Sequence, residues 1–401
     1  MSRKLWRVGR EELQYIEEVI NSGLSGAMNS RFEEAFAAKF GVKYAIGVNS
    51  GTSALHCALS AVGVEEGDEV IVPPLTFAAP ALAVLHQRAI PVFADVDPET
   101  FTIDPEDIKK KITERTKAII PVALYGLPAD MDPIMELAEE NGIKVIEDNA
   151  ECFLGKYKGR VAGTLGHMAI YSFERSKHMT SGNGGVITTD DEMLAERARK
   201  FSILGYTTLT AKQASYKVSK DEVQHPEFKR HELVGYNYRL PEVCAAMALA
   251  QLEKLDMFIE KRRKIAAVYG EAVEGCPWLK PQKVPKGYVH SYWTYAMKLE
   301  GEEYGISWMD FRRTFLEEGG ERFYAAWCVN YLEPAFQKIK FLDRDISYRE
   351  ALCPVAEKLQ KSLIQLKTNF EDLEYARFQA DALRRTIEKL SQKTLTVKRK
   401  T

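Results

Sequence analysis

The chain has 401 residues, 45% of them hydrophobic and 28% charged, and a formal net charge of −2. This length allows one large domain and a smaller one, because single hydrophobic cores rarely grow beyond about 250–300 residues. The charge is nearly balanced and spread along the chain, so we expect neither nucleic acid nor a membrane as a partner. The six cysteines lie far apart, and no apolar run approaches the roughly 20 residues that cross a bilayer. These features favour a soluble cytoplasmic protein with reduced thiols.

Short apolar runs alternate with helical patterns between residues 43 and 190. Most of the runs are rich in Val and Ile and lack polar alternation, which is typical of strands covered on both faces. Strand, helix and strand at this spacing predict βα units and a mostly parallel sheet in an α/β fold. The seven expected strands are residues 44–48, 69–73, 90–96, 118–124, 144–149, 169–173 and 185–189.

The second half of the chain has a different pattern. Residues 191–235 are more polar, and the stretch 207–232 is expected to run as a long excursion over the surface. Residues 240–273 have helical periodicity over a length that suits two consecutive helices, or one helix that leaves the first domain. A strand at 291–300, a helix at 307–319 and later helices follow. We therefore expect a large α/β domain over residues 1–255 and a smaller α+β domain over 256–401.

A first candidate site lies in "VNSGTSALHCAL", where an expected strand gives way to a helix. The small residues around Gly51 and Thr52 let the backbone approach an anion closely, and the free N–H groups of a helix start attract negative charge. Ser and Thr at this place are also ordinary helix N-caps. The motif alone therefore leaves both interpretations open.

Two further candidates follow expected strands. Glu147 and Asp148 stand at the end of one strand, where α/β proteins place ligands, and a carboxylate there could pair with a protonated ring nitrogen or simply cap a turn. Lys177 comes five residues after Ser172, in a loop that a Gly-rich stretch closes. A lysine in such a loop is either a surface charge or an amine that burial prepares for imine formation.

The three candidates together favour one chemistry. An anion-binding turn, a carboxylate for a ring nitrogen and an amine, arranged along one sheet, are the groups that pyridoxal 5′-phosphate requires. This cofactor is an electron sink, and the protein holds its phosphate, keeps its ring nitrogen protonated and supplies the imine lysine.

The sequence resembles the DegT/DnrJ/EryC1/StrS family, which consists mostly of sugar aminotransferases with the fold-type-I architecture. The resemblance extends over about residues 10 to 270, with looser matches such as "HSYWTYAMKL" later in the chain. It is carried by a series of ordered segments: "GVNSGTSALHCAL", "GDEVIVPPLTFAAPALAV", "IPVFADVDPETFTID", "AIIPVALYGLPADMDPI", "VIEDNAECFLGKYKGRVAGTLGHMAIYSFERSKHMTSGNGG" and "GYNYRLPEVCAAMALAQLEKLDMFIEKRR".

The resemblance implies a role for each matching residue. Lys177 would form the imine with the cofactor and Asp148 would pair with the pyridinium nitrogen. The phosphate would be held by Gly51, Thr52 and Ser172. Phe77 would stack on the cofactor ring, and Asn237 would reach the phosphate from a neighbouring subunit. The last match implies a homodimer with shared active sites.

Three positions depart from the family pattern. Glu151 stands near the expected position of the cofactor's phenolic oxygen, where the family usually has Gln or His. Asn183 replaces a more usual Glu, and Ala123 stands where many members have His. None of these removes a group that the core chemistry requires, so we expect them to adjust the substrate pocket.

The resemblance implies ping-pong transamination, with pyridoxamine 5′-phosphate as the intermediate form of the cofactor. Glutamate or glutamine is the expected donor. The expected acceptor is a keto sugar, nucleotide-linked, in sugar, cell-surface polysaccharide or antibiotic biosynthesis. A keto-cyclitol resembling scyllo-inosose is an alternative acceptor, because "SKHMTSG" resembles the version of this motif in cyclitol and antibiotic pathways.

Two rival functions remain at this point. A pyridoxamine-dependent sugar dehydrase has histidine in place of the imine lysine, but here the lysine position is filled by Lys177 and His178 is only its neighbour. We expect His178 to pack or to face the pocket. A non-catalytic regulatory homologue is the other rival, and the joint presence of the lysine, the aspartate and the phosphate residues argues against it.

Overall fold

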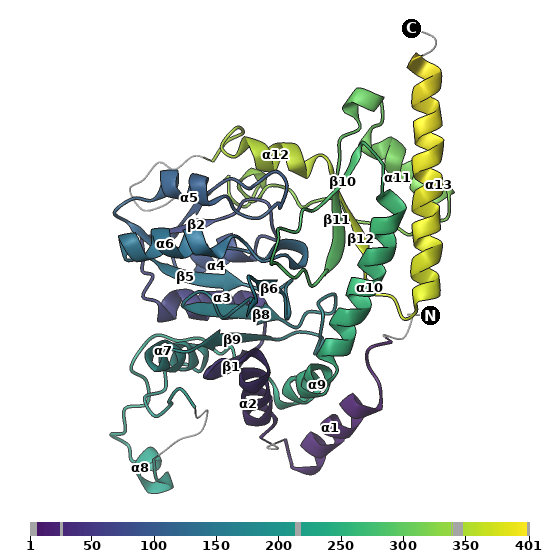
Figure 1. Cartoon of the computed structure of the whole chain (residues 1–401). Coiled ribbons are helices and arrows are strands. Elements are labelled where there is room, and N and C mark those ends of the chain that lie inside the picture. The colour runs from purple at the N-terminus through teal and green to yellow at the C-terminus, as the bar shows by residue number, and fades with distance from the viewer. Residues whose placement is uncertain (1–5, 25–26, 213–217, 338, 340–347, 399–401) are drawn as a thin grey trace.

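The computed structural model describes residues 6–24, 27–212, 218–337, 339 and 348–398. Its centre is a seven-stranded sheet with helices on both faces (Figure 1). In spatial order the strands are β1 (Tyr44–Val48), β9 (Gly185–Thr189), β8 (Met168–Ser172), β5 (Lys144–Asp148), β4 (Thr116–Ile119), β2 (Glu69–Val72) and β3 (Ile90–Phe93). A strand lies within or overlaps each of the seven expected segments.

The sheet is parallel from β8 through β5, β4 and β2 to β3. Only β9 runs against its neighbours, and it pairs antiparallel with both β1 and β8. The predicted α/β fold with a mostly parallel sheet of seven strands is therefore confirmed. Because β1 and β8 both run opposite to β9, they point the same way, and the ends of β1, β8 and β5 lie at one edge.

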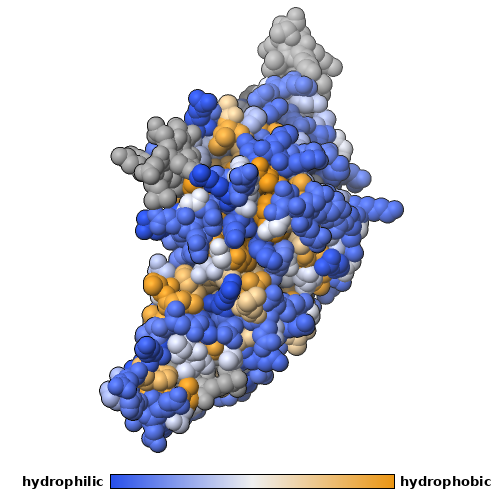
Figure 2. Space-filling view, turned by 90° about the vertical axis from the view of Figure 1, so that its left-hand side faces the viewer, coloured by the Kyte–Doolittle hydropathy of each residue, from blue (hydrophilic) through white to orange (hydrophobic). Residues whose placement is uncertain are grey.

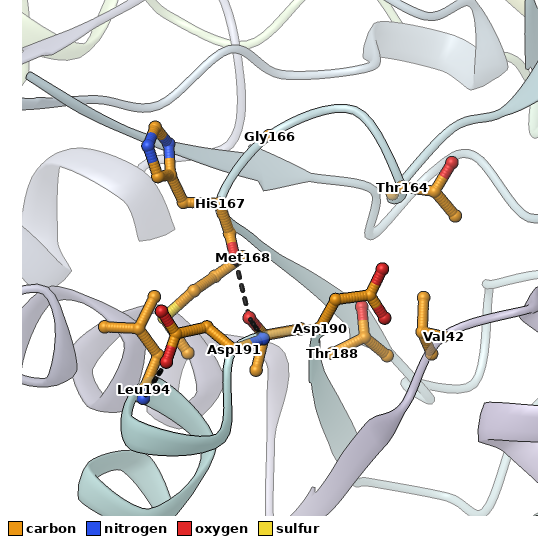
Figure 3. Close-up of a pocket in the computed structure, with 11 residues that line it drawn as sticks. Val42, Thr164, Gly166, His167, Met168, Thr188, Asp190, Asp191 and Leu194 are labelled. Carbon is orange, nitrogen blue, oxygen red and sulfur yellow. Dashed lines mark hydrogen bonds between the residues drawn. The ribbon is translucent and has the colours of Figure 1, made fainter. Parts of the chain in front are cut away.

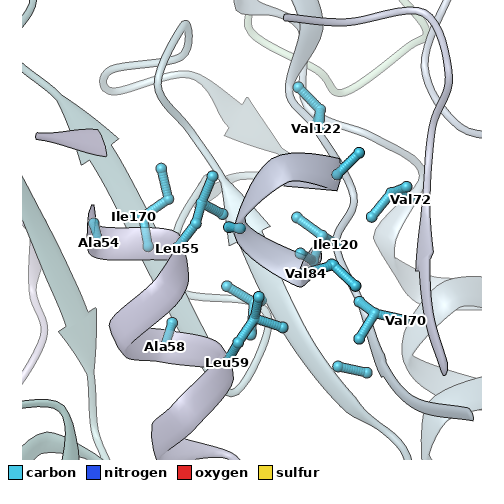
Figure 4. Packing of buried hydrophobic residues seen from close by; sticks show 14 of the residues in the cluster. Ala54, Leu55, Ala58, Leu59, Val70, Val72, Val84, Ile120, Val122 and Ile170 are labelled. Atoms are coloured by element: carbon cyan, nitrogen blue, oxygen red, sulfur yellow. The ribbon is translucent and has the colours of Figure 1, made fainter. Parts of the chain in front are cut away.

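The Val and Ile runs are explained by burial on both faces of the sheet. In β2, Val70 and Val72 face a core shared with Leu55 and Leu59 of α3, whereas Ile71 faces the opposite layer with Ile134 of α6. Figure 4 shows α3 side chains packed against the sheet. The helices of this part are α1 (Arg10–Asn21), α2 (Met28–Phe40), α3 (Gly51–Ala61), α4 (Ala79–His86), α5 (Pro105–Lys111), α6 (Met131–Asn141), α7 (Glu192–Ser202), α8 (Lys220–Gln224) and α9 (Glu242–Glu253).

Helix α7 is the main difference from the sequence-based expectation in this region. The polar stretch from residue 191 begins with a regular helix, whose N-cap Asp191 accepts hydrogen bonds from two backbone N–H groups of the first turn. The charged residues of α7 make the segment look polar in the sequence, but its apolar side chains pack in the core. Beyond it, the excursion carries α8 away from the body of the molecule (Figure 1). Residues 213–217 of that excursion lie outside the described residues.

A second, smaller sheet follows the long helical segment. Residues 240–273 form two consecutive helices, α9 and α10 (Leu255–Val273). Helix α10 then packs beside α13 (Leu373–Lys398). Both helices contribute to a second hydrophobic core, which includes Ile265, Trp278, Phe311 and Leu383. The remaining elements are β6 (Lys156–Tyr157), β7 (Arg160–Val161), β10 (Leu279–Pro281), β11 (Thr294–Leu299), α11 (Trp308–Glu317), α12 (Pro354–Gln360) and β12 (Leu363–Lys367), with short 3-10 turns η1 (Leu124–Gly126), η2 (Glu302–Tyr304) and η3 (Asn330–Leu332).

The segment before β12 returns to the large sheet. Val329, Tyr331 and Cys353 are buried in the same core as α3 and β2. The division at residue 255 coincides with the start of α10, but part of the later chain packs on the first core. The two proposed domains therefore stay a prediction.

The surface mixes hydrophilic residues with small groups of hydrophobic ones on the face in Figure 2. Val234 and Tyr236, near Asn237, are among the large hydrophobic side chains that are exposed. Among the described helices, none is long and apolar enough to cross a membrane. The described residues also contain no cluster of His, Cys, Asp or Glu side chains suited to a metal ion.

We expect Arg199→Met to destabilise the fold strongly. Arg199 of α7 is buried and pairs through both terminal nitrogens with Glu33 of α2, at 3.1 and 2.8 Å. Removing the cation leaves a buried carboxylate unpaired, which costs about 3–5 kcal/mol of unfolding free energy, measurable by urea denaturation. The matched control Lys283→Met breaks an exposed pair with Glu99 and should cost under about 1 kcal/mol. Equal losses in the two variants would contradict the expectation.

Candidate active site

The predicted site residues converge because of the strand register. Ser172 ends β8 and pairs with Gly185, which also pairs with Val48 at the end of β1. Asp148 ends the neighbouring strand β5. Side chains that are far apart in sequence therefore meet at the carboxyl edge of the sheet, where open α/β sheets bind ligands.

Gly51 and Ser172 form a tight contact at the start of α3. Ser50 caps the helix by accepting the N–H of Ser53 at 3.0 Å. A β-carbon added to Gly51 would lie 2.8 Å from the Ser172 Cβ, closer than real side chains approach, and 3.2 Å from its Oγ. Only glycine lets the helix start approach the Ser172 hydroxyl, and the half-buried Thr52 follows directly. The arrangement suits a small anion such as a phosphate group.

Asp148 is a buried carboxylate with a raised pKa. Only 4% of the residue is exposed, and its Oδ1 accepts the Ala150 N–H at 3.0 Å. Burial raises the pKa of Asp148 from 3.8 to about 6, although the Ala150 N–H and the charge of Lys177 act in the opposite direction. A cationic ring nitrogen against this carboxylate would offset the cost of its burial.

Glu147 has a different role from its neighbour. Its two oxygens accept backbone N–H groups of Gly163, Leu165 and Gly166, each at 2.7 Å. It therefore anchors the loop that leads to β8. Of the two acids that the sequence placed at this strand end, only Asp148 has a carboxylate in the electrostatic environment of Lys177.

Lys177 projects from the segment between β8 and β9, residues 173–184, which we call the lysine turn. Its side chain is 12% exposed, and its Nζ lies 3.2 Å from Glu151 Oε1. On another side, the amine lies 4.3 Å from the centre of the Trp293 ring. The amine is therefore partly buried between a carboxylate and an aromatic face.

Glu151 is itself fixed by the opposite loop. Its Oε2 accepts the Tyr125 N–H at 2.9 Å, and the residue is 3% exposed. Tyr125 has a left-handed backbone with φ of 61°, an unusual conformation for a side chain of this size. The geometry gives Glu151 a definite partner in Lys177, which the sequence had left open.

Two buried arginines donate hydrogen bonds to the backbone of the lysine turn. Arg262 of α10 donates to the carbonyl oxygens of Ser176 and Lys177, at 3.3 and 3.2 Å. Arg7 donates to the carbonyl oxygens of Arg175, Lys177 and His178. Burial lowers the pKa of Arg7 to about 10, and burial likewise lowers that of Arg262. Among the described residues, neither guanidinium has a carboxylate partner within ion-pair distance.

The His178 side chain of the lysine turn packs against Ser291 and does not replace the lysine. It is fully buried, and its Nε2 lies 3.0 Å from the Ser291 carbonyl oxygen. Burial holds the pKa of His178 well below its usual value, so the ring is neutral. Its neutrality fits its place beside two buried arginines, because a further positive charge there would be unfavourable.

A connected group of aromatic rings begins at Trp293, beside the amine, and we call it the aromatic wall. Trp293 stacks on Trp327 with ring centres 5.8 Å apart, and Trp327 also meets Tyr125 and Phe77. Phe77 is 56% exposed, so its face is free to stack on a ligand. The sequence marked Phe77 but missed Trp293, since a single aromatic residue has no positional pattern that separates a site from a core.

The remaining marked residues lie outside this cluster. Asn237 is exposed and its Oδ1 accepts a hydrogen bond from Arg239, and the described residues give it no contact with Lys177 or Ser172. Asn183 is also exposed, whereas Ala123 is buried after β4. A separate pocket of about 340 Å³, lined by residues such as His167, Thr188 and Asp190, lies at the opposite edge of the sheet and includes none of the predicted site residues (Figure 3).

The chain belongs to the DegT/DnrJ/EryC1/StrS aminotransferase family, which matches residues 7–380, and it is accordingly a transaminase. GDP-perosamine synthase of Escherichia coli O157:H7 is 40% identical over 286 residues, 71% of this chain and 73% of the relative. The spore coat polysaccharide biosynthesis protein SpsC of Bacillus subtilis is 34% identical over 362 residues, 90% of each chain. The solved structure of S. venezuelae DesV, in complex with a ketimine intermediate, is 31% identical and has a TM-score of 0.81 over 94% of each chain. The fold-type expectation is confirmed.

We expect Asp148→Asn to change how stability depends on pH. Because burial raises the pKa of Asp148 from 3.8 to about 6, the folded chain keeps a proton between these pH values that the unfolded chain has lost. Wild-type stability should therefore fall as pH rises through this window, by up to about 3 kcal/mol relative to the variant. Urea unfolding of both ligand-free proteins on either side of the window measures the difference. A constant difference would contradict the assigned pKa.

Proposed function

We propose that this transaminase uses pyridoxal 5′-phosphate and transfers the amino group of an amino acid to a keto sugar. One observation carries the proposal: the Lys177 amine, the buried Asp148 carboxylate and the Gly51–Ser172 contact meet at one edge of the sheet. The family and the names of the relatives support the same chemistry.

The residues present fit this cofactor. Gly51, Thr52 and Ser172 would hold its phosphate, and Phe77 would cover its ring. Asp148 has the raised pKa of a buried carboxylate without a full positive partner, and a protonated pyridine nitrogen would supply that partner. When bound, the cofactor withdraws electrons from the carbon that loses its proton.

The chain's own groups would then do the following work. Lys177 holds the cofactor through its Nζ, is released by the incoming amino donor and moves a proton from the donor's α-carbon. Asp148 keeps the positive charge at the ring nitrogen. Trp293 would limit the access of water to the amine, because its ring lies against the amine and is itself stacked on Trp327.

The proposed donor is glutamate or glutamine, and the proposed acceptor is a nucleotide-linked keto sugar. The similarity to GDP-perosamine synthase supports such an acceptor, and the similarity to SpsC supports a place in polysaccharide biosynthesis. A keto-cyclitol stays the alternative acceptor. A sugar dehydrase is disfavoured because Lys177 is present. A regulatory homologue is disfavoured because the lysine, the aspartate and the residues that would hold the phosphate are all present.

The active form is proposed to be a cytoplasmic homodimer with shared active sites. Asn237 would complete the phosphate site of a second copy, since it is exposed and the described residues give it no contact with the site of its own chain. The exposed Val234 and Tyr236 beside it would be buried in such an interface.

We expect the protein reconstituted with pyridoxal 5′-phosphate to show the visible absorption band of a protein-bound imine. Lys177→Ala should abolish this band, because no other described lysine approaches Asp148 as Lys177 does. The control Lys286→Ala removes an exposed lysine and should leave the band unchanged. Absence of a band in the wild type would overturn the proposed function. Bleaching by amino acids, followed by recovery with keto sugars or keto-cyclitols, identifies the donor and the acceptor.

We expect Gly51→Ala to weaken cofactor binding roughly tenfold or more, because the new methyl group displaces Ser172 and hydrogen bonds to a charged group are worth about 1.5–3 kcal/mol. Spectroscopic titration with the cofactor measures the affinity. The control is Gly270→Ala in α10, where the added carbon would have its nearest neighbour at 3.8 Å. If both variants bind equally well, Gly51 has no part in the phosphate site.

A further inference from the structure

We propose that Glu151 and Trp293 form a docking site for the positively charged amine of Lys177 whenever this lysine is not bonded to the cofactor. The inference rests on the proposed function, because transamination must release the lysine in each cycle. It assigns a function to a carboxylate that stands where the family usually has Gln or His. It also assigns one to an aromatic residue that no sequence pattern marked.

The geometry encloses the amine on two sides. Glu151 Oε1 lies 3.2 Å from the Lys177 Nζ, within ion-pair distance. The Trp293 ring centre lies 4.3 Å from the same atom, within the range of a cation–π interaction. Both contacts suit a positively charged group, and partial burial of the pair strengthens them relative to water.

Both walls of this docking site are fixed by one residue. The Tyr125 N–H donates to Glu151 Oε2 at 2.9 Å, and the Tyr125 carbonyl oxygen accepts the Trp293 N–H at 2.9 Å. Trp293 is further held by the hydrogen bond from its indole nitrogen to the Ser176 carbonyl oxygen, at 3.0 Å. The carboxylate and the ring are therefore preorganised and need no rearrangement to receive the amine.

The other charged groups near Lys177 do not replace Glu151. Asp148 shares its environment, but on the proposed function that carboxylate would pair with the ring nitrogen of the cofactor. The guanidinium groups of Arg7 and Arg262 face the carbonyl oxygens of the turn, and His178 is neutral. Glu174 and Arg175 are on the exposed side of the turn, where Glu174 accepts from Ser176.

The docking site has a consequence for proton transfer. In the first half-reaction Lys177 would take a proton from the donor's α-carbon and deliver it to the cofactor, and in the second it would take a proton from the cofactor and deliver it to the carbon derived from the acceptor. Between the two transfers of each half-reaction the amine carries the proton as an ammonium. Glu151 and Trp293 stabilise this state and keep the amine from losing its proton to water.

The test measures the reactivity of the Lys177 amine in the whole chain without cofactor. The protein is acylated with acetic anhydride over a range of pH, and the peptide containing Lys177 is compared by mass spectrometry with that containing the exposed Lys286. Only the neutral amine reacts. In Glu151→Gln the amide oxygen can still accept the Tyr125 N–H, but the negative charge is lost.

We expect the Glu151→Gln variant to label roughly tenfold faster at Lys177 near neutral pH, because the amine loses the partly buried charged partner that lies 3.2 Å from it. At high pH, where every amine is neutral, the two proteins should label at the same rate. The matched control Glu174→Gln removes a carboxylate from the same turn that bonds to Ser176 instead, and should label like wild type.

A second variant separates the loss of a contact to the amine from easier access of the reagent. Trp293→Phe should also raise the rate near neutral pH more than the rate at high pH, whereas a mere gain in access would raise both equally. Unchanged labelling of Lys177 in both Glu151→Gln and Trp293→Phe would overturn the inference. A protein that forms no imine band but still shows the labelling difference would refute the proposed function and leave the docking site standing.

Discussion

The hydrogen bonds from Arg7 and Arg262 to the backbone of the lysine turn are the interaction on which the site depends. The turn has no helix or strand of its own to fix residues 174–178, so its carbonyl oxygens need donors from elsewhere. The two guanidinium groups come from the segment before α1 and from α10. Burying two cations is costly, and the depressed pKa values reflect this cost. The position of the Lys177 amine is thus determined by the chain before α1 and by the start of the second core together.

Arg262 also connects this turn to the aromatic wall. It donates to the Trp293 carbonyl oxygen at 2.8 Å and to Thr368 Oγ1 at 3.0 Å. The lysine, the ring that covers it and the residue that follows β12 are therefore tied to one side chain. A shift of α10 relative to the large sheet would move the amine and its cover together, which preserves their mutual geometry.

The sequence predicts well what local pattern determines. Buried strands such as β2 follow from runs of Val and Ile. The position of Asp148 at the end of β5 follows from an acid at the end of such an apolar run. The contact between Gly51 and Ser172 depends on β9 being inserted between β1 and β8, and the pattern of apolar residues carries no strand direction. The roles of Arg7 and Trp293 depend on contacts across 168 or more residues and across 117 residues, respectively, which no periodicity records. The motif resemblance indicated the candidate site residues, but only the fold revealed the residues, such as Arg7 and Trp293, that hold the lysine turn and its amine in position.

The two carboxylates near Lys177 differ in what surrounds them, and this difference separates their functions. Asp148 has one backbone donor for one oxygen and a pKa that burial raises to about 6, so it has the greater need of a new positive partner. Glu151 is already paired, with the amine on one oxygen and the Tyr125 N–H on the other. On the proposed function, a ligand that brings a cationic ring nitrogen would gain most from Asp148, whereas a lysine that leaves the ligand would gain most by returning to Glu151. The site would then offer separate negative partners to the ring nitrogen and to the released amine, and neither positive charge would have to displace the other.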